Sequence, residues 1–106
     1  MVNNKILGLI GFAAKARRVS FGADSVEMQI KKRKVHIVIV AEDSSQRTKD
    51  KFTKLCSEYK IPIFVLGQID ELSKAIGKLN KAILGIEDRN LSNEIVKINN
   101  GGEVIG

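Results

Sequence analysis

Cysteine and histidine are almost absent from this chain of 106 residues, which contains one of each, Cys56 and His36. One cysteine excludes an intramolecular disulfide, and the two residues together cannot complete a four-ligand zinc site. Proline is as scarce, and no linker rich in Pro, Gly or Ser divides the sequence. Because the length suits one ordinary domain, we expect a single domain over residues 1–98 and a flexible C-terminal tail over residues 99–106, with neither a metal nor another cofactor.

Long apolar runs are missing too. Lysines and glycines interrupt the apolar face of the first 16 residues. No run approaches the roughly 20 apolar residues that cross a bilayer, and no secretory signal opens the chain. These absences predict a protein of the reducing cytoplasm without a membrane partner.

Basic residues, in contrast, are abundant and unevenly distributed. Lysine and arginine number 18 against 12 acidic residues, which gives a net charge of +6 and a pI near 9.6. Residues 1–34 contain eight basic and two acidic side chains, whereas residues 87–106 are net acidic. A concentrated positive field attracts polyanions through phosphate contacts. Nucleic-acid binding and simple solubility from solvated lysines both explain this charge.

Hydrophobic periodicity predicts strands that alternate with helices. The predicted helices are 4–17, 24–33, one that begins at Ser44 or Ser45, 70–77 and 90–97, and the predicted strands are 19–21, 35–41, 61–66 and 81–86. This order predicts the α/β class, as a single-domain three-layer α/β/α sandwich with a short mixed sheet of about four strands.

Local signals agree with these boundaries. Residues 35–41 are nearly all apolar and β-branched, which is typical of a central strand covered on both faces. Asn3 or Asn4 is the expected cap of the first helix, and Gly77 the expected C-terminal cap of the fourth. Asp24 and Glu27 stand three residues apart, as in a capping box at the start of the second helix.

Residues able to carry out catalysis are few. His36 lies within an apolar strand and Cys56 on the apolar stripe of the third helix, so both are expected to be structural. Glu42 and Asp43 follow a buried strand, where α/β proteins often place functional acids. The same carboxylates favour the start of the following helix. We therefore expect no enzymatic activity and no small-molecule substrate.

A stronger binding signal surrounds the second predicted helix. Residues 17–25 pass from two arginines through Gly22 into a helix start, whose free N–H groups can hold phosphates or base edges. Lys31 and Lys32 lie two turns further on, roughly in line with Asp24 and Met28. Gly22 is also a turn residue and Asp24 a helix cap, and these structural roles are compatible with a ligand contact.

Several phrases of the sequence resemble one family. They are residues 8–18 (GLIGFAAKARR), 39–43 (IVAED), 55–56, 61–62, 75–78 (AIGK), 85–88 (GIED) and 91–95 (LSNEI). Together they cover about residues 4–98 and are similar to the ribosomal proteins that bind kink-turn RNA, the seven-Ae and thirty-e type superfamily, and in particular to its bacterial YlxQ-type branch. The resemblance implies an α/β/α sandwich that grips a sharply bent RNA stem with G·A pairs.

The resemblance also implies where the RNA binds. The family's second helix carries a Gly-x-Asn-Glu-x-x-Lys pattern that enters the RNA groove. Gly22 is kept here, but Asp24 replaces the asparagine, Ser25 the glutamate and Met28 the lysine. A carboxylate accepts but does not donate hydrogen bonds at neutral pH, and Met28 removes a charge. Lys32 matches a basic position of the family, and Arg18 lies near another.

A second implied contact is the loop after the fourth helix. It comprises Lys78, Leu79, Asn80 and Lys81, with Leu79 against an unstacked nucleotide and the lysines on phosphates. The four phenylalanines and one tyrosine are all expected in the core, so recognition of shape and backbone fits better than stacking of single strands. The expected RNA-binding residues are therefore Arg18, Gly22, Asp24, Ser25, Met28, Lys31, Lys32, Lys78, Leu79, Asn80 and Lys81.

Two functions fit these observations. The first is binding of a kink-turn or similar structured RNA, ribosomal or other, by a monomer, with the ribosome as a further candidate partner. The second is a protein-interaction module on the same fold that has lost kink-turn binding, as the changed helix motif allows.

Overall fold

Helices and strands alternate along residues 3–100, the part of the chain that the computed structural model describes. The elements are α1 (Asn4–Lys15), β1 (Val19–Phe21), α2 (Ala23–Lys31), β2 (Ile37–Val40), α3 (Gln46–Tyr59), β3 (Ile63–Val65), α4 (Ile69–Ala75), β4 (Ile83–Ile86) and α5 (Arg89–Asn99). Every predicted element is present. No helix within these residues is long and apolar enough to cross a membrane.

The four strands form one mixed sheet in the order β1-β4-β2-β3. β4 pairs antiparallel with both β1 and β2, while β2 and β3 are parallel. Every residue of the two central strands, β2 and β4, is buried. Helices cover both faces of the sheet, so both faces of β2 are buried and its side chains are apolar, as the sequence predicted.

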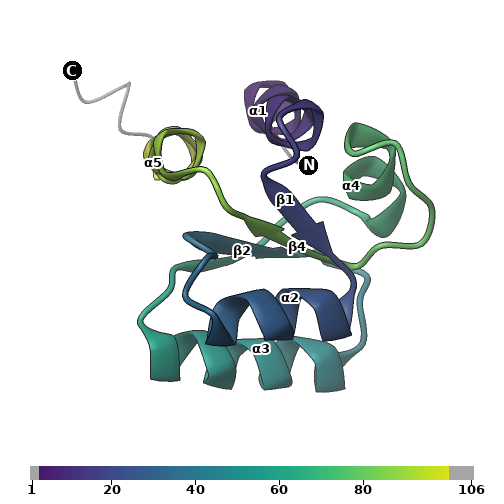
Figure 1. Ribbon diagram of the computed structural model, residues 1–106. Coiled ribbons are helices and arrows are strands. Elements are labelled where there is room, and N and C mark those ends of the chain that lie inside the picture. The colour runs from purple at the N-terminus through teal and green to yellow at the C-terminus, as the bar shows by residue number, and fades with distance from the viewer. Residues whose placement is uncertain (1–2, 101–106) are drawn as a thin grey trace.

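The helices form a layer on each face of the sheet, with α1, α4 and α5 on one side and α2 and α3 on the other (Figure 1). Two hydrophobic clusters follow from this arrangement. One contains Ile10 of α1, Leu72 of α4 and Ile95 of α5, and the other contains Val26 of α2 and Phe52 of α3. The three-layer α/β/α sandwich is confirmed.

Three predicted helix ends are confirmed. The Asn3 side chain accepts a hydrogen bond from the Lys5 amide at 2.7 Å, and the Ser45 hydroxyl accepts one from the Thr48 amide at 3.1 Å. Gly77 follows the last residues of α4 with φ +70°, the left-handed conformation that ends many helices. At the start of α2 the capping-box prediction is wrong, because Gly22 precedes the first helical residue and no side chain caps the helix.

Other boundaries differ by a few residues. α1 ends at Lys15 rather than at residue 17, because Arg17 takes a left-handed φ of +58°. α5 continues to Asn99, and residues 101–106 of the predicted flexible tail lie outside the described residues. The prediction that every phenylalanine lies in the core is wrong for Phe12, whose exposed fraction is 61%.

Candidate nucleic-acid interface

The entry into α2 is an exposed turn held by the edge of the sheet. Gly22 has φ +88° and ψ 151°, and its amide donates a hydrogen bond to the Ile83 carbonyl at 3.0 Å. Asp24, Ser25 and Met28 are exposed on the solvent side of α2, since Val26 and Ile30 face the core. The N-terminal amides of α2 and these three side chains are therefore accessible to a ligand.

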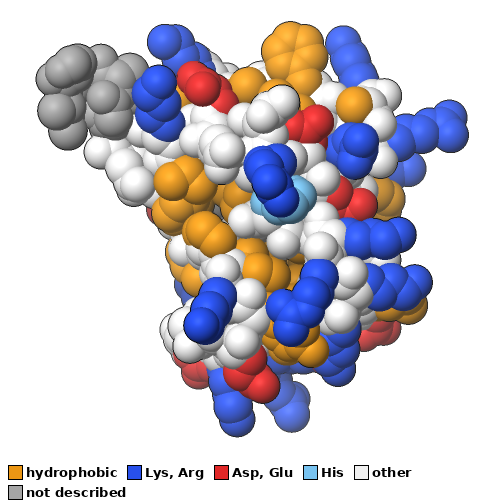
Figure 2. All heavy atoms as spheres, turned by 60° about the vertical axis from the view of Figure 1, so that its left-hand side comes forward, with side chains coloured by type: hydrophobic (Ala, Val, Ile, Leu, Met, Phe, Trp, Pro, Cys, Tyr) orange, Lys and Arg blue, Asp and Glu red, His pale blue; other side chains and the backbone are white. Residues whose placement is uncertain are grey.

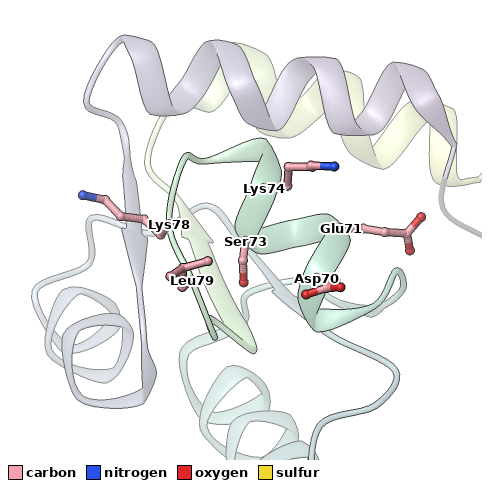
Figure 3. Close-up of a pocket in the computed structure, with 6 residues that line it drawn as sticks. All are labelled: Asp70, Glu71, Ser73, Lys74, Lys78 and Leu79. Carbon is pink, nitrogen blue, oxygen red and sulfur yellow. The ribbon is translucent and has the colours of Figure 1, made fainter.

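The loop between α4 and β4 is also exposed, and Ser73 holds it at both ends. The Lys78 amide donates to the Ser73 carbonyl at 2.8 Å, and the Lys81 amide donates to the Ser73 hydroxyl at 2.8 Å. Asn80 takes a left-handed φ of +55°. Leu79 stands at the tip with an exposed fraction of 83% (Figure 3). The loop thus presents an apolar tip from an ordered base.

These two segments, about 55 residues apart in the sequence, adjoin in the fold. β1 pairs with β4, and this pairing places Phe21 opposite Leu84. Phe21 directly precedes Gly22 in the chain. The ammonium groups of Lys78 and Lys81 lie 5.3 Å and 5.4 Å from the centroid of the Phe21 ring, within cation–π range. Gly22, the exposed start of α2 and the loop 78–81 therefore form one continuous surface, which we call the α2–loop surface.

Lys31 has a different setting from the one that the sequence suggested. Its ammonium group lies 3.0 Å from a carboxylate oxygen of Glu27, whose other oxygen is 2.8 Å from Lys51 of α3. The bonds from Lys51 and then Lys31 lower the pKa of Glu27, and the bond with Glu27 raises the pKa of Lys31. Lys31 therefore shares the Glu27 carboxylate with Lys51, whereas its neighbour Lys32 is exposed and has no ion pair among the described residues.

Arg18 is exposed but lies at the opposite end of β1 from Gly22. Its carbonyl accepts a hydrogen bond from the Glu87 amide at 2.7 Å, which links it to the end of β4. The structure consequently separates Arg18 from the loop 78–81. Arg17, which the sequence analysis did not select, instead lines a hollow together with Lys78.

Phe21 and Ser73 were also missed by the sequence analysis. The alternation of side chains along β1 could have placed Phe21 on the same face as Val19, apart from Ser20. No local pattern marks Ser73, because its role depends on the return of the chain from α4 to β4. Both residues position the α2–loop surface and are mostly shielded from solvent.

The residues considered for catalysis have structural roles. The Glu42 side chain accepts a hydrogen bond from Gln68 at 3.1 Å, and the Asp43 side chain accepts one from the Ile69 amide at 2.8 Å, so both tie the β2–α3 turn to the start of α4. Burial raises the pKa of the Cys56 thiol to about 11, which keeps it protonated at neutral pH. Within residues 3–100, no group of three or more potential metal-ligating side chains comes together.

Positive charge extends beyond the α2–loop surface. Lys and Arg side chains are spread over the face shown in Figure 2, the side on which α5 lies, with fewer acidic side chains between them. Charge alone therefore does not locate a binding site on this protein. The local geometry of the α2–loop surface distinguishes it from the remaining basic surface.

Comparison with known proteins agrees with this architecture. Residues 4–96 match the model of the ribosomal protein L7Ae/L30e/S12e/Gadd45 family. The RNA-binding protein YlxQ of Bacillus subtilis (strain 168) is 30% identical over 90 residues, which cover 85% of this chain and 90% of that protein. The RNA-binding protein YlxQ of Enterococcus faecium is 33% identical over 97 residues, which cover 92% and 93%.

Solved structures show the same fold. A Bacillus halodurans C protein of unknown function has a TM-score of 0.87 and 32% identity, with 91% of this chain and 97% of that chain covered. A Giardia lamblia 15.5kD RNA binding protein has a TM-score of 0.80 at 20% identity, with 92% and 90% covered, and supports the fold alone. The chain belongs to the ribosomal protein L7Ae/L30e/S12e/Gadd45 family.

Proposed function

We propose that this protein binds RNA and recognises a kink-turn or a similarly bent, structured RNA through the α2–loop surface. The carrying observation is the hydrogen bond from the Gly22 amide to the Ile83 carbonyl, 3.0 Å apart, which joins the start of α2 to the first residue of β4, just after the loop 78–81. Two curated relatives over most of the chain are named RNA-binding proteins, which supports the same class of ligand.

The geometry suits a folded RNA better than a single strand. A helix N-terminus offers amides and a partial positive charge to base edges and phosphates. Further cations are Lys32, at the other end of α2, and Lys78 and Lys81, on the adjoining loop. Leu79 gives an apolar contact for an unstacked base, whereas the aromatic ring of Phe21 is occupied by two lysines. Such a surface reads shape and backbone more than stacked bases.

The departures from the family's helix pattern define the test. Asp24→Asn, Ser25→Glu and Met28→Lys together restore the pattern, and all three positions are exposed on α2. We expect the triple variant to bind a kink-turn stem more tightly than the parent, by about 1–3 kcal/mol if one good base contact is regained. Fluorescence anisotropy at one salt concentration would measure both affinities, with a stem of mutated G·A pairs as the control RNA.

If the parent does not bind and the triple variant binds no better, the α2–loop surface is not an RNA site. Equal affinity for the intact and mutated stems would instead contradict kink-turn recognition while leaving general RNA binding in place. The triple variant carries one more net positive charge than the parent, and the stem with mutated G·A pairs controls for the non-specific attraction that this charge adds.

A protein-interaction module is the second candidate, and one observation favours it. Met28 and Leu79 are exposed to 54% and 83%, and both stand on the α2–loop surface where a protein partner would bury them. Met28→Lys distinguishes the two functions, because the added charge should strengthen RNA binding and weaken an apolar protein interface. Affinity purification with the parent and this variant as bait would show which outcome holds.

Three further properties belong to the same proposal. We expect a cytoplasmic monomer that associates with the ribosome or another structured RNA. Sedimentation of the purified protein would establish the monomer, and co-sedimentation with ribosomal subunits would establish the association. Loss of co-sedimentation after nuclease treatment would identify RNA as the point of attachment.

A further inference from the structure

A hollow on the α1 side of β1 lies next to the α2–loop surface. It has a volume of about 360 Å³, towards the lower end of the roughly 300–1,000 Å³ that small ligands occupy. Residues of α1, of β1 and of the end of α4 form its walls. They are Ala14, Arg17, Val19, Phe21, Ile76 and Lys78.

The lining combines an apolar surface with two cations. Val19 and Phe21 project from the same face of β1, since side chains alternate along a strand. Arg17 lies between the end of α1 and β1, and the ammonium group of Lys78 lies 5.3 Å from the centroid of the Phe21 ring. Figure 3 shows the Lys78 side chain directed away from α4. Asp70 and Glu71 lie at the opposite end of α4 from Lys78. Among residues 3–100, no acidic side chain lines this hollow.

A larger hollow of about 380 Å³ differs in its charge. Asp70 and Glu71 contribute to its lining, and Glu71 accepts a hydrogen bond from the Gln68 amide at 2.9 Å as part of the cap of α4. Its two carboxylates offset the charges of Lys74 and Lys78, which also line it, so this hollow has no excess of positive charge to hold a phosphate. Of these two hollows beside Lys78, only the one on the α1 side therefore suits an anionic ligand.

We propose that the hollow on the α1 side binds one unpaired nucleotide of the RNA, with the base against Ala14, Val19 and Ile76 and the phosphate between Arg17 and Lys78. A nucleotide has these two parts, a base with apolar faces and a charged phosphate. The inference rests on the proposed function, because the nucleotide extends from the stem held by the α2–loop surface. Lys78 belongs to both sites and makes them continuous.

The test compares the affinities of the protein for two kinds of RNA. The first is a kink-turn RNA with short, blunt flanking stems. The second is the same RNA with one unpaired five-uridine tail, placed on each strand end in turn. With the parent protein, a tail on one end should tighten binding about tenfold, which corresponds to one added base and phosphate contact. Arg17→Gln should remove this gain and leave the affinity for the blunt RNA within about twofold. Lys15→Gln is the matched control, since Lys15 is exposed on α1, carries the same charge and does not line the hollow.

Each outcome decides between the two proposals. If the parent does not bind the blunt RNA, the proposed function fails and this inference with it. If the blunt RNA binds but no tail tightens binding, only this inference is overturned. If the tail still tightens binding to Arg17→Gln, the tail binds elsewhere on the protein. If Lys15→Gln loses the effect of the tail as fully as Arg17→Gln does, the effect is general electrostatic attraction. Either result also overturns the proposed nucleotide site.

Discussion

At the scale of single residues, Gly22 has the most demanding conformation in the α2–loop surface. Its φ of +88° and ψ of 151° lie in a region that is essentially restricted to glycine. The left-handed φ values of Arg17, Arg33 and Lys60, between 57° and 60°, are less costly for other residues. The geometry at the start of α2 therefore depends on this one glycine.

Gly22→Ala should lower the free energy of unfolding by roughly 1–3 kcal/mol. The cost is conformational, because a Cβ at this position meets no described atom within 4 Å. Gly8→Ala is the control, since Gly8 has equal space but lies inside α1, where alanine should stabilise by roughly 0.5–1 kcal/mol. Urea unfolding of both variants would measure the two effects, and a stable Gly22→Ala would contradict the strain argument.

Cys56 is a second residue whose setting has a measurable consequence. Burial raises its pKa to about 11 from the usual 9.0, so the unfolded chain ionises first as the pH rises. The contribution of the protonated thiol is fully present below pH 9 and is lost as the pH rises through 11. Cys56→Ala should therefore cost about 1 kcal/mol at neutral pH, and this deficit should shrink above pH 9.

Urea unfolding of parent and Cys56→Ala at neutral and alkaline pH would measure this difference. A thiol reagent gives an independent readout, because the native protein should react only as fast as it unfolds. Rapid labelling in the absence of denaturant would show that the interior of α3 is accessible, contrary to its burial.

At the scale of elements, Glu27 connects α2 to α3. Its carboxylate binds Lys31 within α2 and Lys51 on α3, at 3.0 Å and 2.8 Å. Because these bonds lower the pKa of Glu27 below its usual 4.5, the stability they give is present above that pH and is lost as the pH falls through the lowered value. The sites are partly exposed, so the contribution is modest.

Glu27→Gln should accordingly reduce the free energy of unfolding at neutral pH by about 0.5–1 kcal/mol at low salt. The difference from the parent should vanish in acid and decrease in high salt. Thermal unfolding over a pH series would test this, with Glu94→Gln on α5 as a control of equal charge change. If the two variants behave alike, the loss reflects net charge and the connection between α2 and α3 adds nothing.

At the scale of the whole molecule, the net charge of +6 predicts RNA affinity that falls steeply with salt. The structure divides the lysines at the end of α2 into two kinds. Lys32→Gln should flatten the plot of log affinity against log salt by about one unit, as for one lost phosphate contact. Lys31→Gln should change it less, because the Lys31 ammonium group is already engaged in an ion pair with Glu27.

Titrations of the kink-turn stem at several salt concentrations would give both slopes. The two variants have the same net charge, so the comparison isolates the position of the charge. Equal slopes for Lys31→Gln and Lys32→Gln would show that the ion pair with Glu27 does not keep Lys31 from the phosphates. An affinity indifferent to salt would contradict the electrostatic account as a whole.

Much of the fold follows from local sequence. The spacing of apolar residues in α1 and α3, the apolar run of β2, and the caps at Asn3, Ser45 and Gly77 all depend on residues close in the chain. The alternation of strands and helices predicted the three-layer arrangement, the family resemblance implied it as well, and the structure confirms it. Boundaries shifted by a few residues where a left-handed residue such as Arg17 ends a helix early.

The sequence by itself determined the elements, the basic character of the chain and the glycine at the start of α2, because these properties depend on composition and near neighbours. The ion pair of Lys31 with Glu27, four residues apart within α2, is likewise a local pattern. Only the tertiary structure decided that Arg17, and not Arg18, lines a hollow together with Lys78. Pairing of β1 with β4 brings the loop 78–81 to Gly22, and packing of α2 on α3 brings Lys51 to Glu27. Such juxtapositions depend on contacts between distant segments, and no local pattern in the sequence contains them.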